Sequence, residues 1–386
     1  MLQHKSLVAL GLALCLLLAF MGCAKEKAPY KVGAIFAITG PASWLGEPEK
    51  NTTEMIVEEI NKAGGIKGHP LKVIIEDTAG DPTNAINAVN KLIELDSVLA
   101  IIGPSRTGTS LAVAPICEEN RVPLISCAAA ASIVEGREWV FKTPQRDDHA
   151  AMRILEHAKE TGISKIAIIT ATESFGVEGR QHLKRLAPGL GIEIVADETY
   201  GPSDTDMTAQ LQKIKESGAG AVVNWSIVPA QAIVPKNMKQ LQMSIPLYQS
   251  HGFGNIKYVE AAGEAAEGVL FPAGRLLVAE TLPDADPQKA VLTAYKRAYE
   301  TRFAPDKVST FGGHAYDALH LVVGALKKVG PDRAKIREAI ERTRGFVGTG
   351  GVFNYSAEDH TGLGKDAFEM LTVKDGKFAR AKGVQP

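Results

Sequence analysis

The chain has 386 residues, of which 45% are hydrophobic and 23% are charged, and its formal net charge is −1. This length exceeds that of one compact core of ordinary size, which predicts two lobes or domains. The balanced charge, without a run of Lys and Arg, gives no support for binding to nucleic acid or to an anionic membrane surface.

Residues 1–23 resemble a bacterial lipoprotein signal. His4 and Lys5 precede an apolar run at 7–20, and Met21-Gly22-Cys23 follows. Cys23 is then expected to be the lipidated first residue of the mature chain, although a plain cleaved signal and an uncleaved anchor stay open. No later stretch approaches the ~20 apolar residues of a spanning helix. The remainder is therefore expected in the periplasm or on the outer face of a bacterial membrane.

The first half of the mature chain alternates apolar strands with helices. Strands are predicted at 31–38, 71–76, 98–102 and 122–126, with helices ending near 61 and spanning 82–95 and 108–120. Near-continuous apolar strands are typical of sheets covered on both faces. The fold class is therefore α/β, with parallel sheets whose ligands bind beyond the carboxyl ends of the strands.

A second series of the same kind begins after residues 139–143. Its predicted strands are 165–170, 192–196, 221–225 and 246–249, and its helices are 149–160, 176–187, 206–217 and 229–242. Three further helices, at 287–303, 310–329 and 332–342, have no sheet of their own and are expected to pack on the first lobe. The tail, at 351–355 and 367–374, is predicted to form short strands.

Two strand ends in the first series are candidate ligand contacts. Residues 101–110 run from a strand into a helix whose first turn holds Thr107, Gly108 and Thr109, where free amides and the helix dipole favour a carboxylate. Residues 123–132 run from the next strand into Ala128, Ala129 and Ala130, whose backbone a ligand could approach closely. An ordinary strand-to-helix turn without a ligand remains the alternative for the first segment.

No sequence motif indicates a metal, a cofactor or catalysis. The chain lacks a Gly-x-Ser-x-Gly elbow, a phosphate-binding loop, a His-Glu-x-x-His pair and a Cys/His cluster. Glu173, Asp204 and Asp206 fall in predicted loops or helix starts, where capping explains them. Cys117 and Cys127, the cysteines outside the signal, are expected to be buried thiols, with a disulfide between them as the alternative.

The order of short motifs resembles the branched-chain amino-acid (leucine-binding) family of type I periplasmic binding proteins, the substrate-binding subunits of ABC importers. The resemblance covers essentially the whole mature chain. It rests on these segments in this order: Thr39-Gly40-Pro41, residues 58–68 (Glu-Glu-Ile-Asn-Lys-Ala-Gly-Gly-Ile-Lys-Gly), Glu76-Asp77 with Asp81-Pro82, Ile102-Gly103-Pro104, Phe175-Gly176 and residues 262–268.

The resemblance implies two Rossmann-like lobes that close on a ligand and then dock on a membrane permease. Three crossovers are expected, near 143–147, 271–275 and 349–353. Lobe one then comprises 30–144 plus 274–350, and lobe two comprises 145–273 plus 351–386. The resemblance also implies a monomer without cofactors. A ligand-sensing subunit on the same fold is the alternative function.

The resemblance also implies a ligand carboxylate held by Thr107, with Gly108 and Thr109 beside it, and by Ala128 to Ala130. Trp44 and Phe175 match the places of aromatic residues that shield the ligand, with a purely packing role as the alternative. Two places that hold the α-ammonium of amino acids in the family carry His251 and Ala130 instead of an acid and a hydroxyl.

These departures predict a ligand that keeps a carboxylate but lacks the α-amino group, such as an aromatic or aliphatic organic acid. An ammonium without charged partners would lose several kcal/mol on burial. His251, if it titrates near 6.5, is expected to donate to the far end of the acid or to a hydroxyl; a loop histidine with solvent partners is the alternative. A true branched-chain amino-acid binder remains the rival function. The family disulfide is also missing, because its places hold Gly80 and Arg106.

Overall fold

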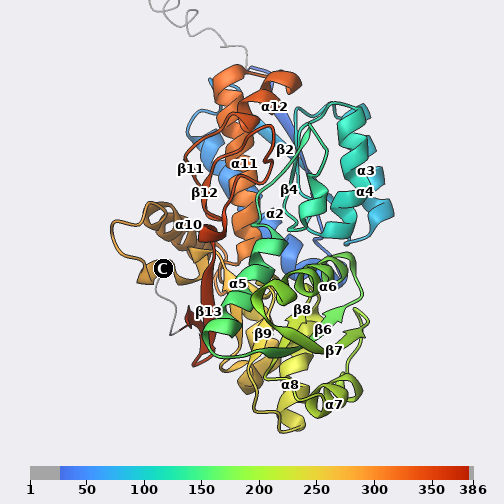
Figure 1. Cartoon of the computed structure of the whole chain (residues 1–386). Helices are drawn as coiled ribbons and strands as arrows, with labels where there is room; N and C mark the ends of the chain where they lie inside the picture. The colour runs from blue at the N-terminus through green and yellow to red at the C-terminus, as the bar shows by residue number, and fades with distance from the viewer. Residues whose placement is uncertain (1–26, 382–386) are drawn as a thin grey trace, which may run out of the picture.

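The computed structural model describes residues 27–381, and Figure 1 shows two lobes, one above the other. The predicted signal and Cys23 lie outside the described residues. Each lobe is built around its own mostly parallel sheet, so the α/β fold with two Rossmann-like lobes is confirmed. Within the described residues, no helix is both long and apolar enough to cross a membrane.

Lobe one contains a parallel sheet in the order β2-β1-β3-β4-β5. Its strands are β1 (Tyr30–Phe36), β2 (Leu71–Asp77), β3 (Ile101–Ile102), β4 (Leu124–Ser126) and β5 (Val140–Lys142). Helices α2 (Ser43–Lys62), α3 (Pro82–Glu94) and α4 (Thr107–Glu119) connect them. Successive strand residues face opposite sides, so Ile101 packs with α3 and α4 while Ile102 packs with α2 and the late helices.

Lobe two contains a sheet in the order β14-β13-β10-β9-β8-β6-β7. Its parallel strands are β6 (Lys165–Ala171), β7 (Glu193–Tyr200), β8 (Ala221–Trp225), β9 (Leu247–Gln249) and β10 (Leu270–Ala273). Its helices are α5 (Asp147–Glu160), α6 (Ser174–Leu186), α7 (Thr208–Glu216), α8 (Ile233–Gln240) and α9 (Ile256–Ala262). The tail adds the antiparallel strands β13 (Glu369–Lys374) and β14 (Lys377–Arg380); β14 was not predicted, because this short polar edge strand carries no apolar run.

The late helices return to lobe one, as predicted. They are α10 (Lys289–Arg302), α11 (Thr310–Val329) and α12 (Arg333–Glu341). Residues of α11 and α12 share a core with β1, β3 and β4, while α10 packs against α2 and the segment η7 (Arg275–Thr281). Figure 1 shows α11 and α12 in orange beside the blue and cyan segments of the upper lobe.

The predicted third crossover near 349–353 is wrong, and so is the assignment of residues from 351 onwards to lobe two. The short apolar run there forms β12 (Val352–Phe353), which pairs with β11 (Phe346–Val347) in a separate two-stranded sheet. Tyr355 and Leu363 are buried in the core of lobe one, and the hydroxyl of Tyr355 donates to Lys142 O at 2.9 Å. The chain enters lobe two only with Phe368, which packs in the other core.

Each lobe brings one helix very close to the end of a strand by means of a glycine. A Cβ atom on Gly46 of α2 would lie 2.2 Å from the backbone of Ala37, which follows β1. A Cβ atom on Gly176 of α6 would lie 2.0 Å from Ala171 O, at the end of β6. These contacts are far shorter than ordinary packing, so both positions require glycine. The helix starts that carry Trp44 and Phe175 are thereby fixed against the strand ends.

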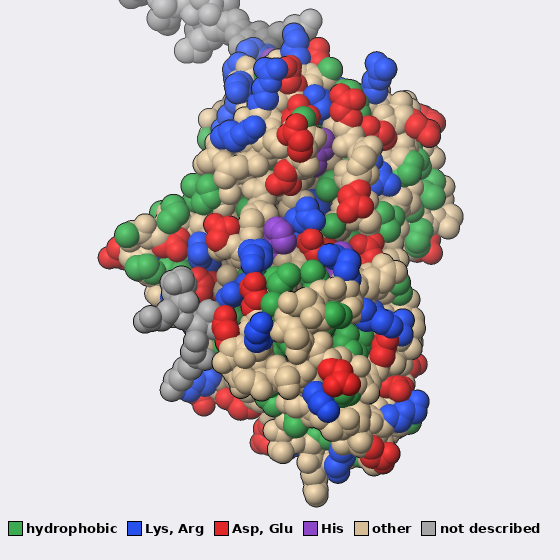
Figure 2. Space-filling model, in the orientation of Figure 1, with side chains coloured by type: hydrophobic (Ala, Val, Ile, Leu, Met, Phe, Trp, Pro, Cys, Tyr) green, Lys and Arg blue, Asp and Glu red, His purple; other side chains and the backbone are tan. Residues whose placement is uncertain are grey.

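The surface and the cysteines agree with expectations from composition. Figure 2 shows acidic and basic side chains interspersed over one face of the molecule, as the balanced charge suggests. Cys117 and Cys127 are both buried and form no disulfide within the described residues, which confirms the expected thiols. Burial raises the pKa of Cys117 to about 12, so this thiol is protonated and unreactive at neutral pH.

Candidate functional site

The two predicted strand ends of lobe one lie side by side. Ile102 of β3 pairs with Ile125 of β4, so the segments that follow leave the same edge of the sheet. Thr107 is the first residue of α4 and is 3% exposed. The first helical hydrogen bond of α4 joins Ser110 N to Arg106 O at 2.9 Å, so the preceding amides have no acceptor within the helix. This edge therefore offers backbone donors beside the Thr107 hydroxyl.

Several polar groups of the predicted set are already used inside lobe one. The Thr109 hydroxyl donates to Arg106 O at 2.9 Å, and the Ala128 amide donates to Ser126 Oγ at 3.1 Å. No partner of the Thr107 hydroxyl is found among residues 27–381, so Thr107 is the hydroxyl of this set that remains for a ligand. Gly108 faces lobe two, because a Cβ atom there would lie 3.0 Å from Ser174 Oγ.

Lysine 142 supports the second strand end, and sequence reasoning missed it. Its side chain is fully buried, and Nζ donates to Ala129 O at 2.5 Å and to Gln145 O at 3.3 Å. Burial lowers the pKa of Lys142 to about 8, with the nearby charge of Asp147 opposing that shift. The only sequence signal was a lysine at the end of an otherwise apolar strand.

Lobe two contributes Phe175 and His251, which contact each other with ring centroids 5.3 Å apart. Trp225, at the end of β8, packs against both rings, and Phe368 packs against His251. The Trp225 ring fits because Gly179 of α6 leaves room for it. Trp225 was not predicted, although it ends an apolar strand at the ligand-facing edge, as such sites require.

The environment of His251 corrects two expectations. His251 lies in η5 (His251–Phe253) and is 7% exposed, so it is not a solvent-exposed loop histidine. Burial lowers its pKa to about 3, so it does not titrate near 6.5 and is neutral at physiological pH. Both ring nitrogens are buried without a hydrogen-bond partner in the described part of the chain. A neutral imidazole offers one donor and one acceptor.

A second buried histidine, His314, comes from α11 of lobe one and was also missed. It is 6% exposed, its Nδ1 has no partner within the described residues, and burial lowers its pKa to about 3. The positive charge of Lys142, and that of His251 when it is protonated, lower this pKa further. The sequence signal was a histidine among glycine and alanine in an apolar helix. The site thus combines two neutral imidazoles from opposite lobes with one buried ammonium.

The lobes contact each other around these residues, which is the arrangement of a closed form. Trp44 is half-buried against Tyr258 of lobe two, with ring centroids 5.2 Å apart, and its carbonyl accepts a hydrogen bond from Asn255 Nδ2 at 2.8 Å. Lys257 pairs with Glu47 at 3.2 Å. Leu45, Ala129 and Phe311 of lobe one belong to the same buried cluster as the core of lobe two.

The acidic residues near the site accept hydrogen bonds from backbone amides. Glu173 accepts hydrogen bonds from Phe175 N at 2.8 Å and Gly176 N at 3.0 Å, and so caps α6. Burial raises the pKa of Glu173, although Arg106 lies 4.0 Å away and opposes the shift. Asp204 and Asp206 accept from nearby backbone amides, at 2.8 and 2.9 Å. Capping therefore explains Glu173, as predicted, whereas Asp204 and Asp206 accept from local backbone amides, and the N-cap of α7, Met207, has no side-chain cap.

Two lobes with parallel sheets that meet over buried polar and aromatic side chains define a two-lobe ligand-binding protein. Gly80 and Arg106, the two positions matched to the family disulfide, are neighbours in lobe one, since Arg106 Nη1 donates to Gly80 O at 3.4 Å. This contact supports the alignment of lobe one with the family. The model of the family described as "Periplasmic binding protein" matches residues 29–377. The chain belongs to this family, whose members bind substrates outside the cytoplasm and are not enzymes.

Relatives and solved structures agree over nearly the whole chain. Leu/Ile/Val-binding protein homolog 3 of Brucella melitensis is 26% identical, over 90% of this chain and 92% of its own. A leucine-, isoleucine-, valine-, threonine- and alanine-binding protein of Pseudomonas aeruginosa is 27% identical, over 80% and 81%. An extracellular ligand-binding receptor from Rhodopseudomonas palustris has a TM-score of 0.86 at 27% identity, covering 92% and 100%. The branched-chain amino acid transporter substrate binding protein LivJ from Streptococcus pneumoniae, in complex with isoleucine, has a TM-score of 0.83 at 26% identity, covering 93% and 100%.

Proposed function

We propose that this protein captures a small organic carboxylate between its lobes, as the substrate-binding subunit of an ABC importer, and presents its closed form to a membrane permease. The observation that carries the ligand class is the state of His251. It is buried among Phe175, Trp225 and Phe368, it is neutral, and neither ring nitrogen has a partner within the described residues.

The anchor for the carboxylate is the edge of lobe one. The Thr107 hydroxyl and the free amides at the start of α4 are donors, and the positive end of the helix dipole favours an anion there. Lys142 adds a buried positive charge behind Ala129. The Ala128–Ala130 backbone completes this side of the ligand.

The far end of the ligand meets aromatic rings and imidazoles. Phe175 and Trp225 provide apolar surface for a ring or an aliphatic chain. His251 and His314 each have a ring nitrogen without a hydrogen-bond partner among residues 27–381, which suits a ligand with a hydroxyl or a second acceptor at that end. An α-ammonium has a poor partner here, because a neutral imidazole carries no negative charge.

A branched-chain amino acid is the second candidate ligand. The names of the Brucella melitensis and Pseudomonas aeruginosa relatives and the isoleucine complex of the Streptococcus pneumoniae protein favour it. The buried carboxylate of Asp147 is close enough to His251 to oppose the lowering of its pKa. Matched ligands separate the two candidates.

The decisive experiment is calorimetric titration with pairs that differ only in the α-amino group. Leucine is compared with 4-methylpentanoate, and phenylalanine with 3-phenylpropanoate. We expect the desamino acid of at least one pair to bind about a hundredfold more tightly, which corresponds to ~3 kcal/mol for an unpaired buried ammonium. Tighter binding of leucine would refute the organic-acid proposal and leave the family function with its usual ligand.

A variant tests the role of His251 directly. His251→Glu restores a carboxylate at the place where the family's amino-acid binders carry one, so it is expected to gain affinity for leucine and to lose affinity for 4-methylpentanoate. His251→Gln is the matched control, because it keeps one donor and one acceptor without adding charge. Equal leucine binding by the two variants would contradict the assigned position of His251.

Lipid attachment at Cys23 is a separate part of the proposal, supported by the signal-like pattern of residues 1–23. Labelled palmitate is expected to be incorporated by a bacterium that expresses the full chain and not by one that expresses Cys23→Ser. Labelling that persists in Cys23→Ser would exclude this cysteine as the anchor.

A further inference from the structure

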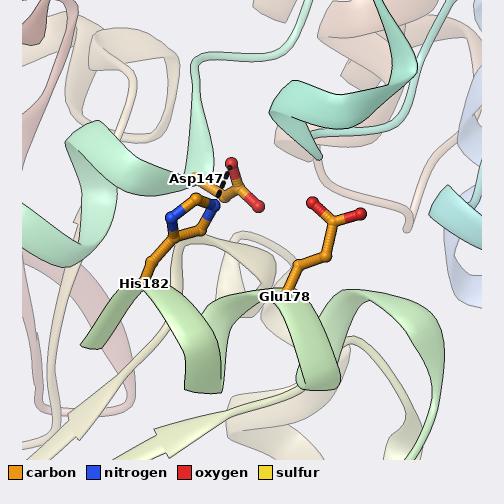
Figure 3. Close-up of side chains that lie close together, drawn as sticks. All are labelled: Asp147, Glu178 and His182. Atoms are coloured by element: carbon orange, nitrogen blue, oxygen red, sulfur yellow. Dashed lines mark ion pairs between the residues drawn. The ribbon is translucent and has the colours of Figure 1, made fainter. Parts of the chain in front are cut away.

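A cluster of three side chains at the junction of the lobes is not used by the proposed ligand site. Asp147 begins α5 directly after the first crossover, while Glu178 and His182 lie one turn apart on α6. One potential ligand atom from each residue lies within 4.8 Å of the other two. Figure 3 shows the three side chains converging from the two helices.

The two oxygens of Asp147 have different surroundings. Oδ1 accepts hydrogen bonds from Ala131 N and Asp148 N, both at 3.1 Å, and lies 3.3 Å from His182 Nε2. Asp147 is fully buried, so Oδ2 has no access to water, yet it has no hydrogen-bond partner among residues 27–381. In Figure 3 this second oxygen points toward Glu178. A buried carboxylate oxygen facing another carboxyl group needs a proton or a cation between them.

We propose that Asp147, Glu178 and His182 form a binding site for one divalent transition-metal cation of the Zn²⁺ class. Imidazole nitrogen together with carboxylate oxygen is a ligand set that suits such cations, with bond lengths of about 2.0–2.2 Å. Oδ2 of Asp147, Oε2 of Glu178 and Nε2 of His182 are the ligand atoms. Glu178 and His182 are half-buried, so the cation has a path from solvent and keeps water in its remaining positions.

Glu178 can bind a cation without losing its contact with lobe one. Its Oε1 accepts a short hydrogen bond from the hydroxyl of Ser132, which leaves Oε2 for the metal. Asp147 likewise keeps the Ala131 amide on Oδ1. The cation is therefore compatible with the closed lobes, and it ties the first crossover to α6. Glu135, Lys142, His251 and Asp148 are the charged or titratable neighbours that influence this cluster.

One local contact opposes the metal and supplies a test. Arg185 Nη2 lies 3.0 Å from Nδ1 of His182, so in the neutral ring Nδ1 is the acceptor and the proton sits on Nε2. Metal binding requires the lone pair of Nε2, so this proton must leave Nε2 and the exposed Arg185 must turn away. Removal of the Arg185 side chain is therefore expected to strengthen metal binding. Protons compete with the metal for His182, so metal binding is expected to release more protons at lower pH.

The test is calorimetric titration of the metal-stripped protein with ZnCl₂ near neutral pH, with MgCl₂ as the comparison. We expect one zinc per chain, an affinity at least about tenfold weaker in Glu178→Gln and His182→Gln, and severalfold tighter in Arg185→Gln. Glu160→Gln, an exposed acid on α5, is the matched control and should bind zinc as the wild type does. Thermal unfolding of each variant checks that the fold is kept.

Absence of zinc binding by the wild type, or an unchanged affinity in both Glu178→Gln and His182→Gln, would overturn the site. Arg185 is exposed, so its variant is expected to fold even where the other two do not. A zinc affinity that fails to rise in Arg185→Gln would also overturn the assignment, because the tautomer of His182 would then play no part. The outcome is independent of which organic ligand the lobes enclose.

Discussion

Replacement of Lys142 by methionine tests whether a buried charge supports the ligand-binding edge of lobe one. The ammonium group is enclosed, and it holds the carbonyl oxygens of Ala129 and Gln145 at 2.5 and 3.3 Å. Burial lowers its pKa from 10.5 to about 8. Methionine keeps the length of the side chain while it removes the charge and both hydrogen bonds.

The magnitude follows from the lowered pKa. In the unfolded chain the amine keeps its proton up to about pH 10, whereas in the folded chain it loses the proton near pH 8, so between these values the unfolded state binds more protons. The stability of the wild type therefore rises with pH through this window. From about pH 7 to about pH 9.5 the gain is ~2 kcal/mol, at 1.36 kcal/mol for each pH unit above 8.

At about pH 7 the variant is expected to be close to the wild type in stability. The charge costs the wild type about 3 kcal/mol, since its pKa falls by some 2.5 units. Methionine removes that cost but leaves two carbonyl oxygens unpaired, at about 1–3 kcal/mol each. As pH rises, the wild type gains stability through this group and Lys142→Met does not.

The assay is urea unfolding followed by tryptophan fluorescence at about pH 7 and about pH 9.5, for the wild type and Lys142→Met. Lys327→Met, which replaces an exposed lysine of α11, is the control and should follow the wild type at both values. The expected result is that the difference in unfolding free energy between wild type and Lys142→Met changes by about 2 kcal/mol in favour of the wild type. If the unfolding free energies of wild type and Lys142→Met changed equally with pH, the lowered pKa of Lys142 would be refuted.

Two further predictions concern the ligand edge and the helix contacts. Thr107→Ala should weaken binding of the carboxylate ligand by about 1–3 kcal/mol in a calorimetric titration. Thr109→Ala should leave the affinity nearly unchanged, because the wild-type Thr109 hydroxyl already donates to the backbone. Equal losses in the two variants would contradict the assigned anchor. Gly176→Ala should lower the melting temperature, because its Cβ would lie 2.0 Å from Ala171 O and force α6 outward at a cost of about 1–3 kcal/mol. Gly189→Ala is the control and should not lower it, because the space around Gly189 is open. Similar melting temperatures of the two variants in a thermal scan would show that α6 can shift freely.

The sequence alone was sufficient for the features that depend on local pattern. The strand–helix alternation of both lobes was predicted from short apolar runs that alternate with segments of helical periodicity. This works because the backbone geometry of a strand or a helix fixes how often a side chain faces the core. Glu173 was assigned correctly as a cap, and Thr107 was placed at the start of a helix beyond a strand. These assignments need only neighbours within a few residues along the chain.

Other properties were decided by contacts between distant segments. The third crossover lies after Leu363 because the apolar residues near 353 pair with β11 instead of entering lobe two. His251 is neutral because Phe175, Trp225 and Phe368, from three separate segments, pack around it. Its lowered pKa follows from this burial, which no local sequence pattern encodes. Only the fold brings His314 toward His251.

The same holds for the proposed metal site and for the buried lysine. Asp147 is more than thirty residues from Glu178 along the chain, so no motif spacing could reveal the cluster that the packing of α5 on α6 creates. The lowered pKa of Lys142 likewise arises only because the sheet and the first crossover enclose its side chain. The sequence determined which elements form and which strand ends face the ligand, and the tertiary structure decided the charges and hydrogen-bonding states there, because burial depends on the whole fold.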